Sequence, residues 1–404
     1  MAVLYENFIV NLKNTCYIQV MVEYITRAVH LPKPGTDTFF LWGPRQAGKS
    51  TLLRNQYPNA LWIDLLKSEE YRRFLENPEL LREEVEYRQP QSVVIDEIQK
   101  IPSLLNEVHW LYENRSVQFV LCGSSARKLR YSGVNLLGGR GLHFELYGFS
   151  ALELGKDFEL KRMLNHGYFP TIYFGSSPKR LLDAYVSHYI QEEIAAEGLV
   201  RRLPVYSQFL STAALSDGEQ VNYSTIARET GVSSETIRGY FEILEDTLLG
   251  SFVPAYRRRP KRRILVSPKF YFTDVGIVNF LARRGEILPG SELFGKAFEN
   301  WVFHELKSYN MYKERFAEIY FWRLSTGTEV DFLINHIDCA IECKSSQNIK
   351  AGHLKGLREL KTEHPEVKRR LIVSLDEKSR ISQDGIEIIG YREFVRRLWM
   401  GDFF

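Results

Sequence analysis

The chain has 404 residues, of which 44% are hydrophobic and 25% charged, and its formal net charge is +3. This balance is that of ordinary globular proteins, so it excludes a mainly disordered chain and a collagen-like fibre, and the length suffices for two to four domains. No stretch approaches the roughly 18 uninterrupted apolar residues that a membrane-spanning helix needs. The N-terminus shows no basic leader followed by an apolar core. We therefore expect a cytoplasmic protein with no membrane partner.

The four cysteines form neither a CxxC pair nor a cluster with the spacing of zinc ligands. They are Cys16, Cys122, Cys339 and Cys343. Buried thiols in a reducing compartment are the expected state. The segment before the second methionine, Met21, is expected to be an N-terminal extension, and Met21 is an alternative start.

Short β-rich stretches alternate with amphipathic stretches from residue 38 onward. Such alternation is typical of a parallel sheet that is covered by helices on both faces. The expected strands of this first part cover residues 38–42, 61–65, 92–95 and 117–122, and the expected helices between them include residues 69–76 and 78–88.

Residues 43–50 match the phosphate-binding pattern G-x-x-x-x-G-K-[ST]. They follow an expected strand and open an expected helix, which is the context that the pattern needs. In such a loop the backbone N–H groups and the helix N-terminus face the phosphates. We expect Lys49 to bridge the β- and γ-phosphates of ATP and Ser50 to hold Mg²⁺. The ATP-binding residues predicted in the loop are Gly43, Pro44, Arg45, Gln46, Ala47, Gly48, Lys49, Ser50 and Thr51.

Two carboxylates follow the expected strand 92–95 directly, and ligands of open parallel sheets bind at that edge. Asp96 is expected to bind the ATP-bound Mg²⁺ through water, and Glu97 to orient and polarise the attacking water. Two further residues are candidates for this site. Ser124, after strand 117–122, is predicted to sense the γ-phosphate or simply to cap the strand end. Arg140, on a glycine-rich turn, is predicted either to stabilise transition-state charge, in its own site or a neighbour's, or to be a structural arginine.

Several motifs together resemble one family. GPRQAGKS, VVIDEIQK, CGSSA and GGR, followed by YFTDVG and VDFLIN…IECK, occur in this order in a group of prokaryotic AAA+-type ATPases whose C-terminal domain was formerly of unknown function. The resemblance spans residues 22–350, and the segment before Met21 departs from it. The resemblance implies that the chain hydrolyses ATP, and that the roles given above apply at the matching positions. AAA+ architecture also implies ring-shaped homo-oligomers, in which Arg140 would act on a neighbouring subunit.

Residues 223–249 favour a helix-turn-helix, with a turn at 231–233 and a cap for the second helix at Ser233 or Ser234. Arg238 and Tyr240 are predicted to face outward. A basic stretch follows where the wing of a winged helix would lie, and its cations would contact DNA phosphates. The predicted nucleic-acid residues are Arg238, Arg257, Arg258, Arg259, Lys261, Arg262 and Arg263. A role as a protein–protein spacer, with the basic stretch as a solvated face, is the alternative.

An Asp followed about ten residues later by Glu-x-Lys is the signature of the PD-(D/E)xK nuclease fold, and the expected strands 329–334 and 340–344 carry it. Asp331 and Glu342 are predicted Mg²⁺ ligands, and Lys344 would stabilise the attacking hydroxide. Glu299, on the expected helix 298–306, would complete the metal site. Two alternatives stay open: charges on an exposed hairpin, or a genuine fold that has lost hydrolysis. Further strands are expected at residues 269–272, 319–323 and 369–374.

These patterns predict an α/β chain in five parts. They are an N-terminal extension and helix (1–30), a P-loop NTPase core with a parallel sheet (31–155), a helical connector (156–200), a winged helix-turn-helix (201–265) and a mixed α/β restriction-endonuclease-like domain (266–404). The expected function is ATP hydrolysis that acts on DNA or is gated by it, with Mg²⁺-dependent cleavage left open. The alternative is a nucleotide-dependent switch or scaffold for a protein partner, with an inert nuclease fold.

Overall fold

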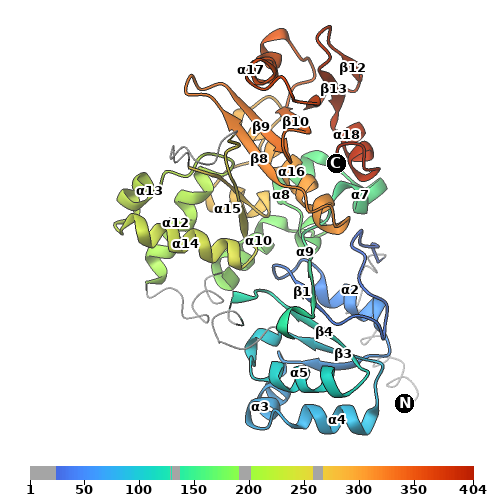
Figure 1. The fold of residues 1–404 in the computed structure, drawn as a ribbon. Helices are drawn as coiled ribbons and strands as arrows, with labels where there is room; N and C mark the ends of the chain where they lie inside the picture. Colours follow the sequence, from blue (N-terminus) through green and yellow to red (C-terminus); the bar gives the residue numbers. More distant parts are fainter. Residues whose placement is uncertain (1–23, 128, 130–136, 191–201, 258–266) are drawn as a thin grey trace, which may run out of the picture.

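The computed structural model describes residues 24–127, 129, 137–190, 202–257 and 267–404 (Figure 1). The N-terminal α/β part lies at one end of the molecule and the C-terminal mixed sheet at the other, with the helical units between them. Within the described residues, no helix is long and apolar enough to cross a membrane.

The first part is a five-stranded parallel sheet with the strand order β2-β3-β4-β1-β5. Its strands are β1 (Phe39–Trp42), β2 (Leu61–Asp64), β3 (Ser92–Asp96), β4 (Gln118–Gly123) and β5 (Leu142–Glu145). The helices around it are α2 (Lys49–Gln56), α3 (Ser68–Glu76), α4 (Leu80–Arg88) and α5 (Leu104–Asn114). The four strands expected from the sequence are confirmed. The fifth, β5, was missed because only one of its four residues is buried.

The two faces of this sheet belong to different hydrophobic cores. Side chains alternate along a strand, so Phe39 and Leu41 pack on one face of β1 while Phe40 and Trp42 pack on the other. The face of Phe40 is covered by apolar residues of α3, α4 and α5. The face of Phe39 belongs to a core that continues into the C-terminal domain and includes Trp301. The parallel sheet and the C-terminal domain therefore share one apolar interior.

Helices predominate between the two sheets. They are α7 (Ala151–Leu154), α8 (Leu160–His166), α9 (Pro170–Tyr173) and α10 (Pro178–Asp183), followed by a π-helical segment (Ala184–Ile190). Three helices and a hairpin follow: α12 (Leu203–Leu215), α13 (Tyr223–Thr230), α14 (Ser234–Asp246) and the antiparallel pair β6 (Gly250–Val253) and β7 (Lys269–Phe272). The hairpin leads into α15 (Val275–Leu281).

At the turn between α13 and α14, Gly231 is left-handed and Ser233 caps α14 by accepting from Thr236 N. The outward placement of Tyr240 is wrong, because its ring packs against Tyr206 and Phe209 in the core of this unit. The hairpin also crosses the expected boundary at residue 265, since β7 pairs with β6.

The C-terminal part is a six-stranded mixed sheet with the order β12-β13-β11-β10-β9-β8. Its strands are β8 (Ile319–Arg323), β9 (Glu329–Ile334), β10 (Cys339–Lys344), β11 (Arg369–Ser374), β12 (Arg380–Ile381) and β13 (Glu387–Gly390). Its helices are α16 (Glu292–Tyr312), α17 (Lys355–Glu363) and α18 (Tyr391–Trp399). Strands β8, β9 and β10 are antiparallel neighbours, whereas β10, β11 and β13 run parallel. The 21-residue helix α16 packs on β10 and is largely buried.

Candidate nucleotide site and the acidic cluster of the C-terminal domain

The phosphate loop connects β1 to α2 at the carboxyl edge of the parallel sheet. Gly48 has φ +95°, a left-handed conformation that glycine adopts without a steric cost, and α2 begins at the next residue. The Lys49 ammonium bends back over the loop and donates to the carbonyl oxygens of Gly43 at 2.6 Å and Pro44 at 3.1 Å. Lys49 is buried. The ammonium therefore lies on the loop whose N–H groups would face phosphates.

Ser50 and Asp96 meet across the sheet edge. The Ser50 hydroxyl donates to Asp96 Oδ2 at 2.7 Å, and the other oxygen of Asp96 accepts from Glu97 N at 3.1 Å. A hydroxyl and a carboxylate are hard oxygen donors of the kind that Mg²⁺ prefers. The structure thus brings together the two side chains that the sequence predicts as holders of a nucleotide's Mg²⁺.

Glu97 is buried and has φ +60°, an uncommon backbone conformation for a residue with a side chain. Its carboxylate accepts from Gln99 Nε2, and Arg45 Nε lies 3.7 Å from its other oxygen. Gln99 Nε2 also donates to Ser124 Oγ at 3.0 Å. Because β4 lies between β1 and β3, Ser124 is placed between the phosphate loop and the acidic pair.

Gln99 is a site residue that sequence reasoning missed. It is a buried glutamine that links Glu97 to Ser124, and a Cβ added at Gly123 would meet its Oε1 at 2.2 Å. The sequence offered two signals: a glutamine two residues after Glu97, and Gly123 directly after the expected strand 117–122. The close approach requires that glycine.

Arg140 does not reach the phosphate loop of its own chain. It precedes the amino end of β5, whereas the loop follows the carboxyl end of the parallel neighbour β1. Its exposed side chain pairs with Glu113, near the C-terminal end of α5. Opposite edges of the sheet separate Arg140 from the loop, so the prediction that Arg140 stabilises charge in its own site is wrong.

Arg27 is a second residue that sequence reasoning missed, and its guanidinium is almost fully buried. Nη1 donates to the carbonyl oxygen of Ala47, in the phosphate loop, at 2.7 Å. Nη2 donates to Tyr147 O at 2.7 Å and lies 3.3 Å from the Tyr312 hydroxyl at the end of α16, while Nε pairs with Glu153 at 2.9 Å. A lone arginine in a segment expected to be an extension carried no signal.

A cavity of about 400 Å³ adjoins the loop. Its lining is mostly apolar and includes Gly48 and Thr51 of the nucleotide motif together with Ile25, Phe149 and Phe174. Such an apolar recess beside a phosphate loop is suited to a flat heteroaromatic ring.

The predicted nucleic-acid residues are only partly described. Arg238 is exposed on α14, and its guanidinium lies 4.5 Å from the ring centre of Tyr223. Arg257 is half-buried after β6. Arg258, Arg259, Lys261, Arg262 and Arg263 lie outside the described residues.

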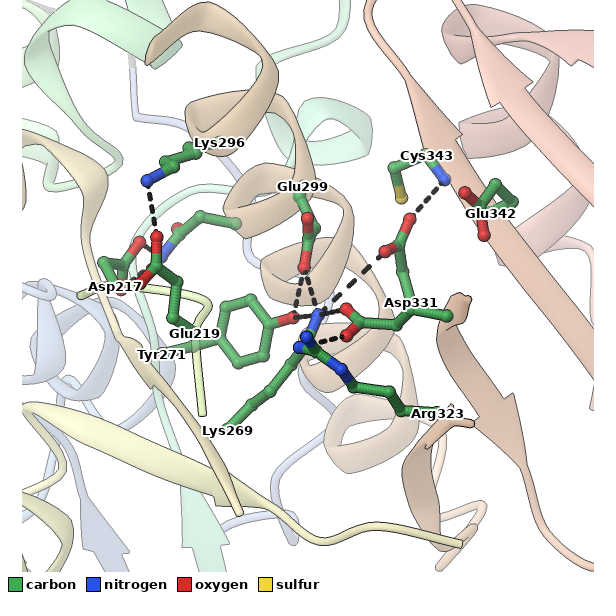
Figure 2. Close-up of polar contacts among 12 residues, drawn as sticks. Asp217, Glu219, Lys269, Tyr271, Lys296, Glu299, Arg323, Asp331, Glu342 and Cys343 are labelled. Carbon is green, nitrogen blue, oxygen red and sulfur yellow. Dashed lines mark hydrogen bonds and ion pairs between the residues drawn. The ribbon is translucent and has the colours of Figure 1, made fainter. Parts of the chain in front are cut away.

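The acidic residues of the C-terminal domain surround an ammonium group that was not part of the predicted site (Figure 2). Lys269 Nζ, from β7, lies 2.9 Å from Glu299 Oε1 and 2.5 Å from Glu329 Oε1. It lies 4.0 Å from Asp331 Oδ1, and the other oxygen of Asp331 accepts from Cys343 N at 2.7 Å. We call Lys269, Glu299, Glu329, Asp331 and Glu342 the acidic cluster.

The charged groups of the acidic cluster shift one another's pKa values. Burial, together with the negative charges of Glu299 and Glu342, raises the pKa of Asp331 well above its ordinary value. Burial also raises the pKa of Glu342, against the opposing influence of Lys344. Burial alone would lower the pKa of Lys269, but the surrounding carboxylates raise it above its ordinary value.

The cluster does not form the metal site predicted from the sequence. Glu299 Oε1 already accepts from Lys269 and from the Tyr271 hydroxyl. Lys344, predicted to be catalytic, pairs with Glu342, whose other oxygen is buried without a partner. In the part of the chain that the structure describes, no group of three or more His, Cys, Asp or Glu side chains is arranged to hold a metal ion. The prediction of a three-carboxylate set is wrong because an ammonium lies among its members.

Comparison with known families matches three consecutive regions of the chain. Residues 36–155 match an AAA domain, residues 157–287 match a domain of unknown function, DUF8612, and residues 294–394 match another, DUF4143. The region that matches the AAA domain contains the phosphate loop and the pair Asp96–Glu97. The second region covers both the helical connector and the hairpin β6–β7, in agreement with the strand pairing across residue 265.

Relatives and solved structures add no defined activity. Uncharacterized protein Rv2008c of Mycobacterium tuberculosis is 25% identical over 320 residues, which cover 77% of this chain and 69% of the relative. An uncharacterized protein of Haemophilus influenzae is 25% identical over 297 residues, 65% of this chain and 72% of that protein.

Two solved structures resemble the chain weakly. The Aeropyrum pernix ORC1 protein, solved in complex with DNA, has 14% identity and a TM-score of 0.25, over 61% of this chain and 86% of that one. A signal-transduction ATPase (STAND) protein from Pyrococcus horikoshii has 12% identity and a TM-score of 0.21, over 73% and 50%. Scores of this size do not establish a common overall fold.

Proposed function

We propose that the chain binds ATP with Mg²⁺ at the phosphate loop and hydrolyses it to ADP and phosphate. The observation that carries the proposal is the 2.7 Å hydrogen bond from Ser50 to Asp96. It joins the helix that follows the loop to the acidic strand end, which are the two halves that such a site requires. The match of residues 36–155 to an AAA domain supports the same assignment.

Each residue then has a defined task. Lys49, which rests on the loop carbonyl oxygens, turns to the β- and γ-phosphates, where its charge is neutralised better than by carbonyl dipoles. Mg²⁺, when bound, supplies positive charge at the phosphates, and Ser50 and Asp96 would hold it. Glu97 orients the attacking water and accepts its proton, once its carboxylate leaves Gln99. The 400 Å³ apolar cavity takes the adenine ring.

Phosphate release and nucleotide binding, measured on the same preparations, test this proposal. Lys49→Ala is expected to lose both, and Glu97→Gln to keep binding while turnover falls by roughly 10²–10⁴-fold. Lys67→Ala is the matched control, at an exposed lysine of the same domain that makes no side-chain capping bond. It should change neither nucleotide binding nor turnover. Turnover that survives Lys49→Ala would reject the assignment.

We further propose that the winged-helix-like unit contacts DNA phosphates. The three helices and the hairpin have the order of a winged helix, and Arg238 is exposed on the second helix of the predicted motif. The basic stretch 257–263 adds cations next to this surface in sequence. If the protein does not bind DNA at low salt, and DNA does not change the rate of ATP turnover, the role as a protein–protein spacer is the better explanation.

A nucleotide-dependent switch is the second candidate function, and the Arg27 contacts favour it. One buried guanidinium bonds to the phosphate loop and to the Tyr312 hydroxyl of the C-terminal domain. Movement of the loop on nucleotide binding would therefore reach α16 directly. In a ring of several copies, Arg140 would serve the nucleotide of a neighbour, since it lies at the opposite edge of its own sheet.

A further inference from the structure

We infer that Lys269 is a resident counter-ion that occupies the place of a divalent cation in the acidic cluster, so that the C-terminal domain excludes Mg²⁺ and does not cleave phosphodiesters in this state. The inference concerns a different domain from the proposed ATP site and does not depend on ATP hydrolysis. It accounts for a nuclease-like pattern of residues that fails to form a metal site.

The position of the ammonium carries the argument. Lys269 is buried, and its Nζ lies within 4.0 Å of carboxylate oxygens from three residues, Glu299, Glu329 and Asp331 (Figure 2). The Tyr271 hydroxyl lies 3.5 Å from the same nitrogen. Mg²⁺ binds oxygen at about 2.0–2.1 Å in an octahedron and retains several waters. An ion of that kind and the lysine nitrogen cannot occupy this space together.

Charge balance gives the reason why the ammonium stays. Four carboxylates stand in or beside the cluster, those of Glu299, Glu329, Asp331 and Glu342, and three cations pair with them, those of Lys269, Lys344 and Arg323. Buried like charges repel strongly unless they are neutralised. Loss of the lysine would leave four carboxylates with two cations, a deficit that a divalent ion or protons must fill.

Lys269 is held in place, because its strand is fixed at several points. Strand β7 pairs with β6, and the Tyr271 hydroxyl donates to Glu299 at 2.5 Å. One residue further, Phe272 N donates to Asp217 and Phe272 O accepts from Asn300 of α16 at 3.0 Å. Lys269 belongs to the region that matches DUF8612, whereas the carboxylates belong to the region that matches DUF4143. The winged-helix-like unit thus closes the acidic cluster of the next domain.

Mn²⁺ binding to the nucleotide-free full-length chain, followed by the EPR signal of free Mn²⁺, tests the inference without reference to activity. The wild type is expected to have no Mn²⁺ site that depends on Asp331, so Asp331→Asn alone should leave Mn²⁺ binding unchanged. Lys269→Met is expected to gain one such site, at least about tenfold tighter than any site of the wild type, and Lys269→Met with Asp331→Asn is expected to lose it again.

Lys296→Met is the matched control, since Lys296 pairs with Glu219 and Glu292 outside the cluster and its removal should create no site. Where Lys269→Met fails to fold, Lys269→Gln removes the same charge, keeps a polar side chain and carries the same expectation. An Asp331-dependent Mn²⁺ site in the wild type overturns the inference, and so does a folded Lys269 variant that gains none.

Discussion

Arg27 Nη1 and the carbonyl oxygen of Ala47 are joined by a hydrogen bond of 2.7 Å in the protein interior. The same guanidinium contacts the hydroxyl of Tyr312, the last residue of α16, at 3.3 Å. That hydroxyl in turn accepts from Tyr147 N at 2.9 Å. The phosphate loop and the longest helix of the C-terminal domain therefore share one buried cation, so neither can shift without a change in the contacts of the other.

Tyr312→Phe tests this connection with the loss of a single oxygen. The variant leaves Tyr147 N without its acceptor, which is expected to lower the free energy of unfolding by about 1–3 kcal/mol. Because Arg27 also loses a partner, the position of Ala47 becomes less defined, and ATP affinity is expected to fall about tenfold. Isothermal titration with a slowly hydrolysed ATP analogue measures the affinity.

Tyr309→Phe separates coupling from general damage to α16. The Tyr309 hydroxyl lies on the same helix but donates to the carbonyl oxygen of Phe404 at 2.9 Å, away from Arg27. Its removal should lower stability without a change in nucleotide affinity. Equal effects of the two variants on affinity would contradict the connection through Arg27.

The backbone of Glu97 predicts an unusual order of stabilities. At φ +60° a side chain costs of order 1 kcal/mol that glycine does not. We therefore expect Glu97→Gly to be more stable than Glu97→Ala by about 1 kcal/mol in urea unfolding, although both should lose ATP hydrolysis. At Glu86, an exposed position within α4, the order should reverse, since glycine is the poorer helix former. A lower stability of Glu97→Gly than of Glu97→Ala would rule out strain at this residue.

Much of the candidate nucleotide site could be predicted because its residues are close in sequence to a strand end. The loop 43–50 and the pair Asp96–Glu97 follow buried β-rich stretches, and parallel strands bring their carboxyl ends together whatever lies between them. Arg27 could not be predicted in this way. Its partners Ala47, Glu153 and Tyr312 are 20, 126 and 285 residues away, and no local pattern records such contacts.

In the acidic cluster, the sequence predicted which side chains lie together but not the lysine that lies among them. Spacing along β9 and β10 predicted that Asp331, Glu342 and Lys344 lie near one another, and they do. Spacing could not reveal that Lys269, 62 residues before Asp331 in the sequence, enters from a strand of the preceding unit. A motif defines which side chains share a region, whereas the charge at its centre depends on every segment that packs there.

Glu305 predicts a pH dependence of stability. Burial raises its pKa to about 7, although its oxygens accept from Ala151 N at 2.6 Å and from Trp399 Nε1 at 3.1 Å, which lower it. The folded chain therefore retains a proton that the unfolded chain releases near its ordinary pKa of 4.5. More protons on the folded state mean that the free energy of unfolding falls as pH rises from about 4.5 to about 7.

Glu305→Gln removes this proton and leaves a neutral group of the same size. We expect the wild type to lose stability relative to Glu305→Gln between pH 5 and pH 8, by up to several kcal/mol, in urea unfolding at matched ionic strength. His304 does not produce this trend, because burial lowers its pKa to about 3 and so makes its own contribution rise with pH between about 3 and 6.5. A constant difference between the two proteins across this range would show that Glu305 is ionised in the folded state.

Arg238 is expected to contribute one phosphate contact to the proposed binding of DNA. Its guanidinium rests on the Tyr223 ring at 4.5 Å and is exposed, so it can meet a phosphate without a large loss of side-chain entropy. Arg238→Ala is expected to weaken binding of duplex DNA and to reduce the slope of log K against log salt concentration by about 1, as for one lost phosphate contact. Fluorescence anisotropy over a series of salt concentrations measures both. Arg72→Ala, at an exposed arginine of α3, removes the same charge at the end of the molecule away from α14 (Figure 1) and should leave the slope unchanged. If the two variants alter the slope equally, the attraction comes from net charge and not from α14.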